Sequence, residues 1–269
     1  YFEWHDDKTW FPHGRDVSAT SQIMLHVTAA TTYQIFQNSL SLYDFTIFFP
    51  AVIGALTVIV MFALVRLFAG TNAGLIAALL FAISFPIVLR GTIGWFKSEP
   101  LGLFYGLIGL YLFLSGIKSK NKKIAILKII FGGVTLAFGL ASWGGDQFFI
   151  IPIGLFIFSL PFIRKDHNFL IWSVPLFVAS FFLTLNLFER PGLTFITSIG
   201  GVSLIVPTLF LVLSIFIQKI SKNQNKIRNN VIFLIVVILS STFVMILNTE
   251  LDFLPLSPFR YLNAINPFL

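Results

Sequence analysis

The sequence predicts an all-α polytopic membrane protein, with about eight spanning helices and one further helix on the outer surface. Hydrophobic residues make up 57% of the 269 residues and charged residues only 11%, with a mean hydropathy of +0.90. A soluble domain carries roughly 25% charged residues. Long apolar stretches alternate with short loops, and the loops hold most of the basic residues.

The composition also excludes several classes of protein. A chain so poor in charge is neither a soluble enzyme, nor a nucleic-acid-binding protein, nor a disordered tail. The net charge of +7 comes mostly from residues between apolar stretches, which suits loops beside a membrane. The sequence has no cysteine, which excludes disulfides, thiolate metal sites and cysteine nucleophiles within it. It opens at Tyr1 without a signal peptide, so we expect a piece of a longer protein.

Apolar stretches of sufficient length define the spans. A helix that crosses about 30 Å of hydrocarbon needs about 20 mostly apolar residues. Eight stretches meet this requirement: 45–68, 73–89, 99–117, 124–141, 147–163, 168–188, 196–217 and 231–248. The stretch 18–38 holds too many Ser, Thr, Gln and His residues to face lipid. We expect it to form a helix that lies at the interface or packs on other helices.

Charges in the loops predict the topology, because short cytoplasmic loops collect Lys and Arg. Three loops separated by two spans each carry them: Lys118, Lys120, Lys122 and Lys123; Arg164 and Lys165; and Lys219, Lys222, Lys226 and Arg228. The outer side then receives ten of the eleven acidic residues: Glu3, Asp6, Asp7, Asp16, Asp44, Glu99, Asp146, Glu189, Glu250 and Asp252. Charge bias in sorting is the favoured explanation of this asymmetry, and a cation or polar-substrate site on the outer face is the alternative.

We expect three parts along the chain. Residues 1–44 form an external segment with the interfacial helix, and residues 45–248 form the transmembrane bundle. Residues 249–269 form a second external segment.

The run Arg90-Gly-Thr-Ile-Gly-Trp-Phe-Lys-Ser-Glu-Pro100 is the first candidate for chemistry. Proline is favoured in the first helical turn, so Glu99 stands at a helix start, where the macrodipole stabilises a carboxylate. One interpretation makes Glu99 a capping residue that pairs with Lys97 across an exposed loop. The other makes it a metal ligand or an acidic wall of an active site at the membrane surface.

Two further runs carry less specific signals. His5, Asp6 and Asp7 could bind a divalent cation, but consecutive carboxylates point different ways in most backbones, which favours a surface loop with aromatic anchors. In Ser142-Trp-Gly-Gly-Asp146, the paired glycines allow a tight turn between spans and Trp143 suits the lipid–water interface. No Ser–His–Asp arrangement, Walker loop or dinucleotide fingerprint is present in the sequence.

Taken in order, these segments resemble the membrane domain of the oligosaccharyltransferase catalytic subunit of the archaeal AglB type, over nearly the whole chain. The family's Trp-aromatic-Pro-x-Gly-Arg run resembles Trp10 to Arg15, and Trp4-His5-Asp6-Asp7 stands before it. Arg90 and Glu99 fall where the family has an arginine and an acidic motif, and Ser142 to Gly145 meets its Ser-Trp-Gly-Gly element. Arg260-Tyr261-Leu262 with Asn266-Pro267 resembles the run before its mobile external loop.

The resemblance implies a GT-C-type glycosyltransferase in the cell membrane, with its active site on the extracytoplasmic face. Such an enzyme moves an oligosaccharide from a dolichyl phosphate or diphosphate carrier to an acceptor asparagine in an Asn-x-Ser/Thr sequon, with inversion at the sugar carbon. Its implied cofactor is Mn²⁺ or Mg²⁺, and its partners are the lipid-linked oligosaccharide, the acceptor protein and the bilayer, without nucleic acid. The implied roles are a catalytic Arg90, a metal ligand in Glu99, and substrate-binding Lys97, Arg15, Trp143 and Asp146.

Three departures from the family pattern affect these expectations. The family's first acidic motif would precede Tyr1, and the acidic motif of its mobile loop and its soluble domain with a WWDYG site would follow Leu269. We therefore expect the fragment alone to be inactive. Lys97 stands where the family usually has an aspartate ligand, and we expect it to contact a lipid-linked phosphate or Glu99.

Two other functions remain as alternatives. Another polyprenyl-phosphate glycosyltransferase of the same membrane fold, such as a protein mannosyltransferase, would lack the Ser-Trp-Gly-Gly element. A secondary transporter would carry ionisable or helix-breaking residues in mid-membrane and inverted repeats. The apolar stretches here are nearly free of charge and no repeat is visible, which disfavours the transporter.

Overall fold

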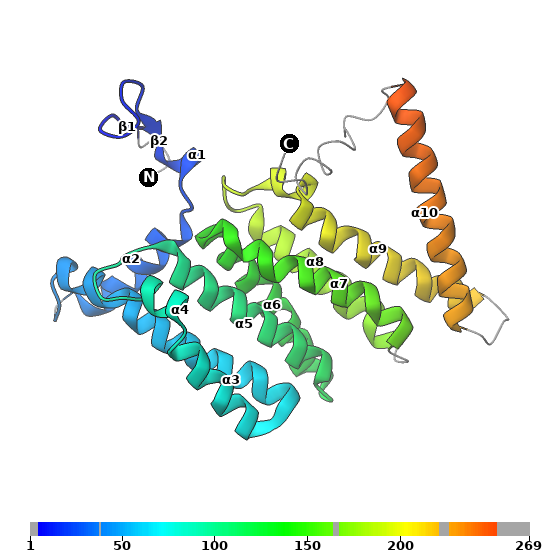
Figure 1. Cartoon of the computed structure of the whole chain (residues 1–269), viewed down its shortest axis with the longest axis horizontal. Coiled ribbons are helices and arrows are strands. Elements are labelled where there is room, and N and C mark those ends of the chain that lie inside the picture. Colours follow the sequence, from blue (N-terminus) through cyan, green and yellow to red (C-terminus); the bar gives the residue numbers. More distant parts are fainter. Residues whose placement is uncertain (1–4, 38, 164–166, 221–225, 252–269) are drawn as a thin grey trace.

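A computed structural model describes residues 5–37, 39–163, 167–220 and 226–251 as a bundle of helices (Figure 1). Its helices are α1 (Val17–Thr20), α2 (Met24–Phe36), α3 (Leu42–Ala82), α4 (Phe85–Arg90), α5 (Ser98–Lys118), α6 (Lys122–Ser142), α7 (Gln147–Ile163), α8 (His167–Leu185), α9 (Ile199–Ile220) and α10 (Lys226–Leu251). Short 3₁₀ helices η1 (Gly144–Asp146) and η2 (Leu193–Thr197) and a small hairpin of β1 (His5–Asp6) and β2 (Arg15–Asp16) complete them. In this part of the chain six helices are long and apolar enough to cross a membrane, and Ile227–Ser240 is a shorter apolar helix. The all-α membrane architecture is confirmed.

The first two predicted spans fall on one long helix, α3, which has two arms. Its 41 residues would extend roughly 60 Å if straight, about twice the thickness of the hydrocarbon core. The helix breaks at Gly70, whose φ of 84° and ψ of 178° are not helical, and only glycine adopts this conformation readily. Beyond the break, a methyl group at Gly74 would lie 3.0 Å from the carbonyl oxygen of Phe62, so the arms fold back on each other (Figure 1).

The predicted span 73–89 is wrong at its end. α3 stops at Ala82, and α4 begins at Phe85 after Ser84, with Pro86 in its first turn. Proline lacks an N–H group, and its ring collides with the carbonyl of the residue four positions earlier. Pro86 therefore ends one helix and starts another, which turns Arg90 away from the line of α3.

The remaining spans lie close to their predicted positions. α5, α6 and α7 match the predicted 99–117, 124–141 and 147–163 within two residues at each end, and the other three shift by up to five. The expected helix 18–38 is instead divided into α1 and α2. Leu25 and Ala29 of α2 are buried against Phe45 and Phe49 of α3 and Leu101 of α5, so α2 packs on other helices.

The main core lies between α5, α6, α7, α8 and α9. Phe113 stacks on Phe177 with ring centroids 4.1 Å apart, and both side chains are fully buried. α5 and α6 approach closely at a small residue, because a methyl group at Gly132 would lie 3.0 Å from the backbone nitrogen of Phe113. Close packing of this kind is typical of helices in membranes.

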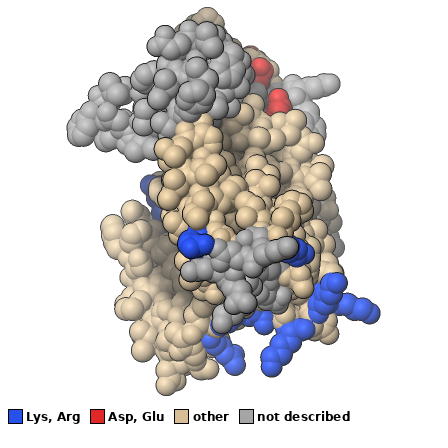
Figure 2. All heavy atoms as spheres, turned by 90° about the vertical axis from the view of Figure 1, so that its right-hand side faces the viewer, with Lys and Arg blue, Asp and Glu red and all other residues tan. Residues whose placement is uncertain are grey.

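The loops sort into two ends of the bundle. At one end, the Lys118 ammonium donates to the carbonyl of Leu67, 2.5 Å away, which joins the basic α5–α6 loop to the turn of α3. At the other end, the Gly94 N–H donates to the Ile47 carbonyl, and the Arg190 guanidinium donates to the Thr20 carbonyl over 2.7 Å. On the face shown in Figure 2, most visible basic side chains lie toward the bottom and the visible acidic ones near the top. Several predicted markers lie outside the described residues: Glu3, Trp4, Arg164, Lys165, Lys222, Asp252 and the motif over 260–267.

Candidate functional site

The turn between α4 and α5 brings Arg90 and Glu99 together. α4 ends at Arg90 with Gly91 as its C-cap, and the chain then passes through Gly94, whose φ of 84° needs glycine. The Gly94 N–H donates to Ile47 of α3 over 2.9 Å, which fixes the turn to the bundle. α5 begins at Ser98, so Glu99 lies in its first turn as the sequence predicts.

An ion pair joins the two predicted residues. The Arg90 Nη1 atom lies 3.2 Å from Glu99 Oε1, with side chains 51% and 24% exposed. The other carboxylate oxygen, Glu99 Oε2, is buried and has no hydrogen-bond partner among the described residues. Glu99 therefore presents one oxygen to Arg90 and leaves the other without a described partner.

Lys97 does not make an ion pair with Glu99 among the described contacts; it contacts Trp95. The Lys97 Nζ atom and the Arg90 guanidinium carbon each lie 5.8 Å from the centre of the Trp95 ring. Cations at this distance from an indole face are attracted by the ring. Two positive side chains thus lie at Trp95, and the pairing of Arg90 with Glu99 leaves an excess of one positive charge.

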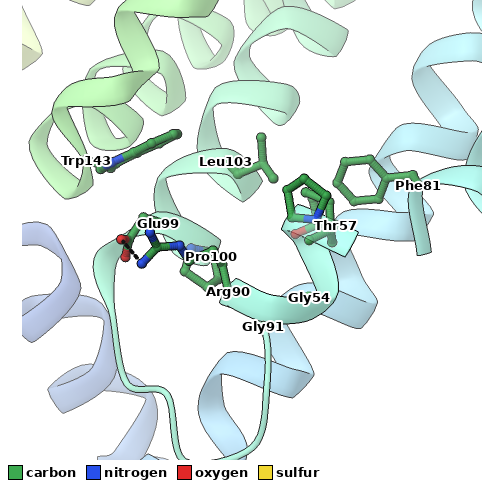
Figure 3. A pocket seen from close by; sticks show the side chains of 11 residues that line it. Gly54, Thr57, Phe81, Arg90, Gly91, Glu99, Pro100, Leu103 and Trp143 are labelled. Carbon is green, nitrogen blue, oxygen red and sulfur yellow. Dashed lines mark hydrogen bonds and ion pairs between the residues drawn. The ribbon is translucent and has the colours of Figure 1, made fainter. Parts of the chain in front are cut away.

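An apolar pocket of about 460 Å³ opens beside the ion pair (Figure 3). Its walls come from α3, α4, α5 and the end of α6: Gly54, Thr57, Phe81, Pro86, Ile87, Arg90, Gly91, Glu99, Pro100, Leu103 and Trp143. Figure 3 shows Trp143 on one side and the ion pair at the edge. The pocket can accept an apolar group while Arg90 and Glu99 meet a polar one.

Trp143 reaches this pocket from the turn that follows α6. The backbone N–H of Trp143 donates to the Gly139 carbonyl over 2.8 Å, and the extended backbone of this residue leads directly into η1. Asp146, at the end of η1, is 0% exposed and does not line the pocket. The structure therefore brings Arg90, Glu99 and Trp143 into one site, with Lys97 beside it and Asp146 behind it.

Arg15 lies elsewhere, in the β1–β2 hairpin. Its guanidinium lies 5.8 Å from the centre of the Trp10 ring, and its Nε atom lies 4.0 Å from Asp6. Arg15 is not among the pocket residues, so a contact between Arg15 and substrate stays a prediction.

Hydrogen bonds hold the hairpin and account for its acidic residues. The His5 Nδ1 atom lies 2.7 Å from Asp16 Oδ1, and His5 Nε2 lies 3.2 Å from the His13 carbonyl. The bond to Asp16 raises the pKa of His5, and the Thr9 hydroxyl lowers the pKa of Asp6. No group of three or more His, Asp or Glu side chains in the described ranges is arranged to hold a metal ion, so the surface-loop interpretation is favoured over the cation site here.

The described residues offer a divalent cation one ligand at the pocket. Glu99 Oε2 is a buried carboxylate oxygen without a partner there, and carboxylate oxygen is the ligand that Mg²⁺ and Mn²⁺ prefer. Further carboxylate ligands would have to come from beyond the described residues, and water would complete the coordination.

Sequence reasoning missed Trp95 and the wall formed by α3. Trp95 stands between Arg90 and Lys97 in the sequence, and its aromatic ring was a usable signal. Gly54 and Thr57 lie more than thirty positions before Arg90. Nothing in their residue types connects them to Glu99, because the pairing depends on how α3 packs on α5.

Comparison with known proteins identifies the family. Residues 2–255 match the family model described as oligosaccharyl transferase STT3, N-terminal. A curated relative, the dolichyl-diphosphooligosaccharide–protein glycosyltransferase subunit STT3A of Oryza sativa subsp. japonica, is 27% identical over 158 residues, which cover 57% of this chain and 20% of the relative. The STT3B subunit of Arabidopsis thaliana is 26% identical over 60% of this chain and 22% of that protein. The chain thus spans about one fifth of these relatives.

Solved structures show the same fold. The apo form of the Archaeoglobus fulgidus oligosaccharyltransferase matches with a TM-score of 0.74 and 20% identity, over 99% of this chain and 33% of that one. The same archaeal enzyme has been solved with Zn and sulfate, with a tethered acceptor peptide containing the NVT sequon, and, as AglB, with an inhibitory peptide and a dolichol-phosphate. Each of these complexes matches with a TM-score of 0.68 over 90% of this chain. The chain therefore belongs to the oligosaccharyltransferase STT3 family, in its N-terminal membrane domain.

Proposed function

We propose that this chain is the membrane part of an enzyme that transfers an oligosaccharide from a dolichyl phosphate or diphosphate carrier to asparagine in Asn-x-Ser/Thr sequons. The observation that carries this proposal is the Arg90–Glu99 pair at the edge of an apolar pocket, at the acidic end of the bundle. A carrier lipid has the same two parts, an apolar chain and a charged phosphate. Family membership favours this function over a transporter or a mannosyltransferase.

We infer a GT-C-type bundle of eight spans in the cell membrane. The first arm of α3 provides one span, its second arm together with α4 provides another, and α5, α6, α7, α8, α9 and α10 provide six. The basic α5–α6 loop supports a cytoplasmic position for its end of the bundle, by the positive-inside rule. The pocket then faces the extracytoplasmic side, where acceptor proteins are aqueous and the lipid tail of the donor stays in the bilayer. Residues 1–44 and 249–269 are external segments in this arrangement.

Each residue of the site has a proposed task. Trp143 and the apolar wall take the lipid chain next to the phosphate, and Lys97 attracts the phosphate. Arg90 holds Glu99 in place and can bind the acceptor or a second carboxylate. Arg15 has no contact with the pocket, so its role toward substrate would require another surface of the complete enzyme.

The chemistry demands charge stabilisation at this place. An amide nitrogen is a poor nucleophile because its lone pair is delocalised into the carbonyl, and the departing carrier phosphate develops negative charge as the sugar carbon is attacked from the opposite face. Glu99 Oε2 would be one ligand of Mn²⁺ or Mg²⁺, and a bound divalent cation supplies Lewis acidity toward the amide and the phosphate. The archaeal relative has been solved with Zn, which supports a divalent metal in the family.

The test compares Glu99→Gln with Asp44→Asn in the full-length protein. Asp44 also lies in the first turn of a helix, but its carboxylate pairs with Ser41 and does not line the pocket. We expect Glu99→Gln to weaken Mn²⁺ affinity and to reduce transfer to a sequon peptide by about 10²-fold or more, while Asp44→Asn changes neither. Unchanged metal affinity and transfer in Glu99→Gln would remove Glu99 from the site.

A further inference from the structure

The carboxyl group of Asp146 lies in a closed slot directly behind the pocket. Its side chain is 0% exposed, and neither carboxyl oxygen has a hydrogen-bond partner among the described residues. A polar group buried without a partner costs free energy. No described hydrogen bond therefore explains this side chain, and its close neighbours are glycines.

Three glycines form the walls of this slot. A methyl group at Gly102 of α5 would lie 3.2 Å from Asp146 Oδ1, and one at Gly106, one helical turn further, would lie 2.8 Å from Oδ2. A methyl group at Gly139 of α6 would overlap Oδ2. The Asp146 carboxylate therefore occupies space that side chains at these three positions would otherwise take.

Trp143 is attached to the same slot. The backbone N–H of Trp143 donates to the Gly139 carbonyl over 2.8 Å, and the backbone carbonyl of Trp143 accepts from the Asp146 backbone N–H over 3.1 Å. The Cβ atom of Trp143 lies 2.5 Å from the place that a methyl group at Gly102 would take. Trp143 and Asp146 therefore lie against the same residue of α5, Gly102, and are joined by a backbone hydrogen bond.

The facing wall of the pocket belongs to that same helix. Glu99, Pro100 and Leu103 of α5 line the pocket together with Trp143, and Gly102 lies between Pro100 and Leu103. A change in the contact between α5 and the Trp143 turn alters the space between the indole ring and the Glu99 carboxylate. Figure 3 labels both side chains among those that line the pocket.

We propose that Asp146 is a positioning residue of the donor site, which acts through its size by holding Trp143 at a fixed distance from Glu99. The donor touches Trp143 and not Asp146. This role replaces the expected direct contact of Asp146 with substrate, because the side chain is fully buried. The proposal rests on the proposed function, since it takes the pocket to be the place of the carrier lipid.

Two substitutions at Asp146 separate size from charge. Asp146→Asn keeps the size and removes the acid, whereas Asp146→Glu keeps the acid and adds a methylene group. The full-length protein in lipid nanodiscs is tested for its Kd for dolichyl phosphate. We expect Asp146→Asn to stay within about twofold and Asp146→Glu to raise the Kd about 10-fold, the effect of overpacking by one methylene.

A second measurement follows Trp143 without any ligand. Acrylamide quenching of its fluorescence is obtained as the difference between each variant and the same variant carrying Trp143→Phe. Asp146→Glu should change this quenching and Asp146→Asn should not. If Asp146→Glu does not fold, Gly102→Ala provides the second variant, because its methyl group presses on the Trp143 Cβ atom.

Gly154→Ala is the matched control. A methyl group at Gly154 would overlap the Ser203 carbonyl oxygen, between α7 and α9 and outside the pocket lining. This variant should lose thermal stability but keep the wild-type Kd and Trp143 quenching.

Two results would overturn the proposal. One is the reverse pattern, in which Asp146→Asn weakens binding and Asp146→Glu does not, since charge would then matter. The other is a loss of stability alone in Asp146→Glu, as in the control. A wild-type protein that binds no dolichyl phosphate would refute the proposed function instead, and the Trp143 quenching would still decide whether Asp146 sets the position of the indole.

Discussion

At the scale of single residues, the sequence indicated the members of the site better than their partners. The rule that proline follows a helix start placed Glu99 correctly in the first turn of α5. The alternative pairing of Glu99 with Lys97 was wrong, because Arg90 takes that place at 3.2 Å. Residues two apart at a helix start point in different directions. Lys97 faces Trp95 instead, and only the fold of the turn reveals this.

Lys97 should contribute to binding of the donor by its charge. Lys97→Ala removes a cation beside the pocket, and a charged hydrogen bond to phosphate contributes about 1.5–3 kcal/mol. We expect the Kd for dolichyl phosphate to rise about 10-fold or more in Lys97→Ala, and to stay near the wild-type value in Lys97→Arg. Titrations at low and high salt measure the Kd and its salt dependence. The salt dependence should be weaker in Lys97→Ala than in the wild type. Equal Kd values in wild type and Lys97→Ala would exclude this contact.

At the scale of elements, the length of the apolar stretches predicted the positions of the long helices. The differences between prediction and structure occur where proline or glycine breaks a helix. Pro86 divides the predicted span 73–89, and this break was readable from the sequence. The hairpin within α3, by contrast, was not predictable from the sequence. Its turn depends on Gly70 in a left-handed conformation and on Lys118 from another helix, and no local pattern specifies that contact.

Gly70→Ala should destabilise this hairpin. A side chain at a φ of 84° and ψ of 178° introduces strain of about 1–3 kcal/mol. Gly54→Ala is the control, because a methyl group meets nothing within 4 Å at either position and only Gly70 has a positive φ. Thermal unfolding in detergent should show a lower Tm for Gly70→Ala alone. A similar Tm for the two variants would mean that the turn relaxes without cost.

The β1–β2 hairpin should open as the pH rises. The pKa of His5 is raised in the folded hairpin, chiefly by its hydrogen bond to Asp16. The charged pair therefore stabilises the hairpin fully below the ordinary histidine pKa of about 6.5, and this contribution is lost as the pH rises through the raised pKa. The rate of limited proteolysis within the β1–β2 hairpin, measured at a series of pH values, should rise above the raised pKa of His5. His5→Gln should remove the pH dependence, whereas His13→Gln should keep it, because His13 contacts His5 through its backbone carbonyl.

At the scale of the whole molecule, composition and charge predicted the membrane class and the division of the loops between two ends. This division follows from sorting by the bilayer, which acts on short segments and is therefore readable from sequence. The meeting of α3, α5 and the end of α6 around one pocket is not readable in this way. It depends on glycines such as Gly139, at which two helices approach closely. A single sequence does not distinguish such a glycine from one that forms a flexible turn.

The orientation is testable by labelling from the two sides. The chain contains no cysteine, so single cysteines at Lys120 and Thr92 report on the α5–α6 and α4–α5 loops. In intact cells, an impermeant maleimide should label Thr92→Cys, and Lys120→Cys should react only after the membrane is opened. Labelling of Lys120→Cys in intact cells would place the Glu99 turn in the cytosol and contradict the proposed function.

The bond from Arg190 to the Thr20 carbonyl joins positions that lie 170 residues apart in the chain. A ribosome completes the first of these long before the second, since synthesis proceeds from the N-terminus. The segment that contains Thr20 therefore lacks this hydrogen bond while α3 to α8 are inserted. The bond can form only after Arg190, which follows α8, has been synthesised. Maturation of this end of the protein is thus a late event of biogenesis.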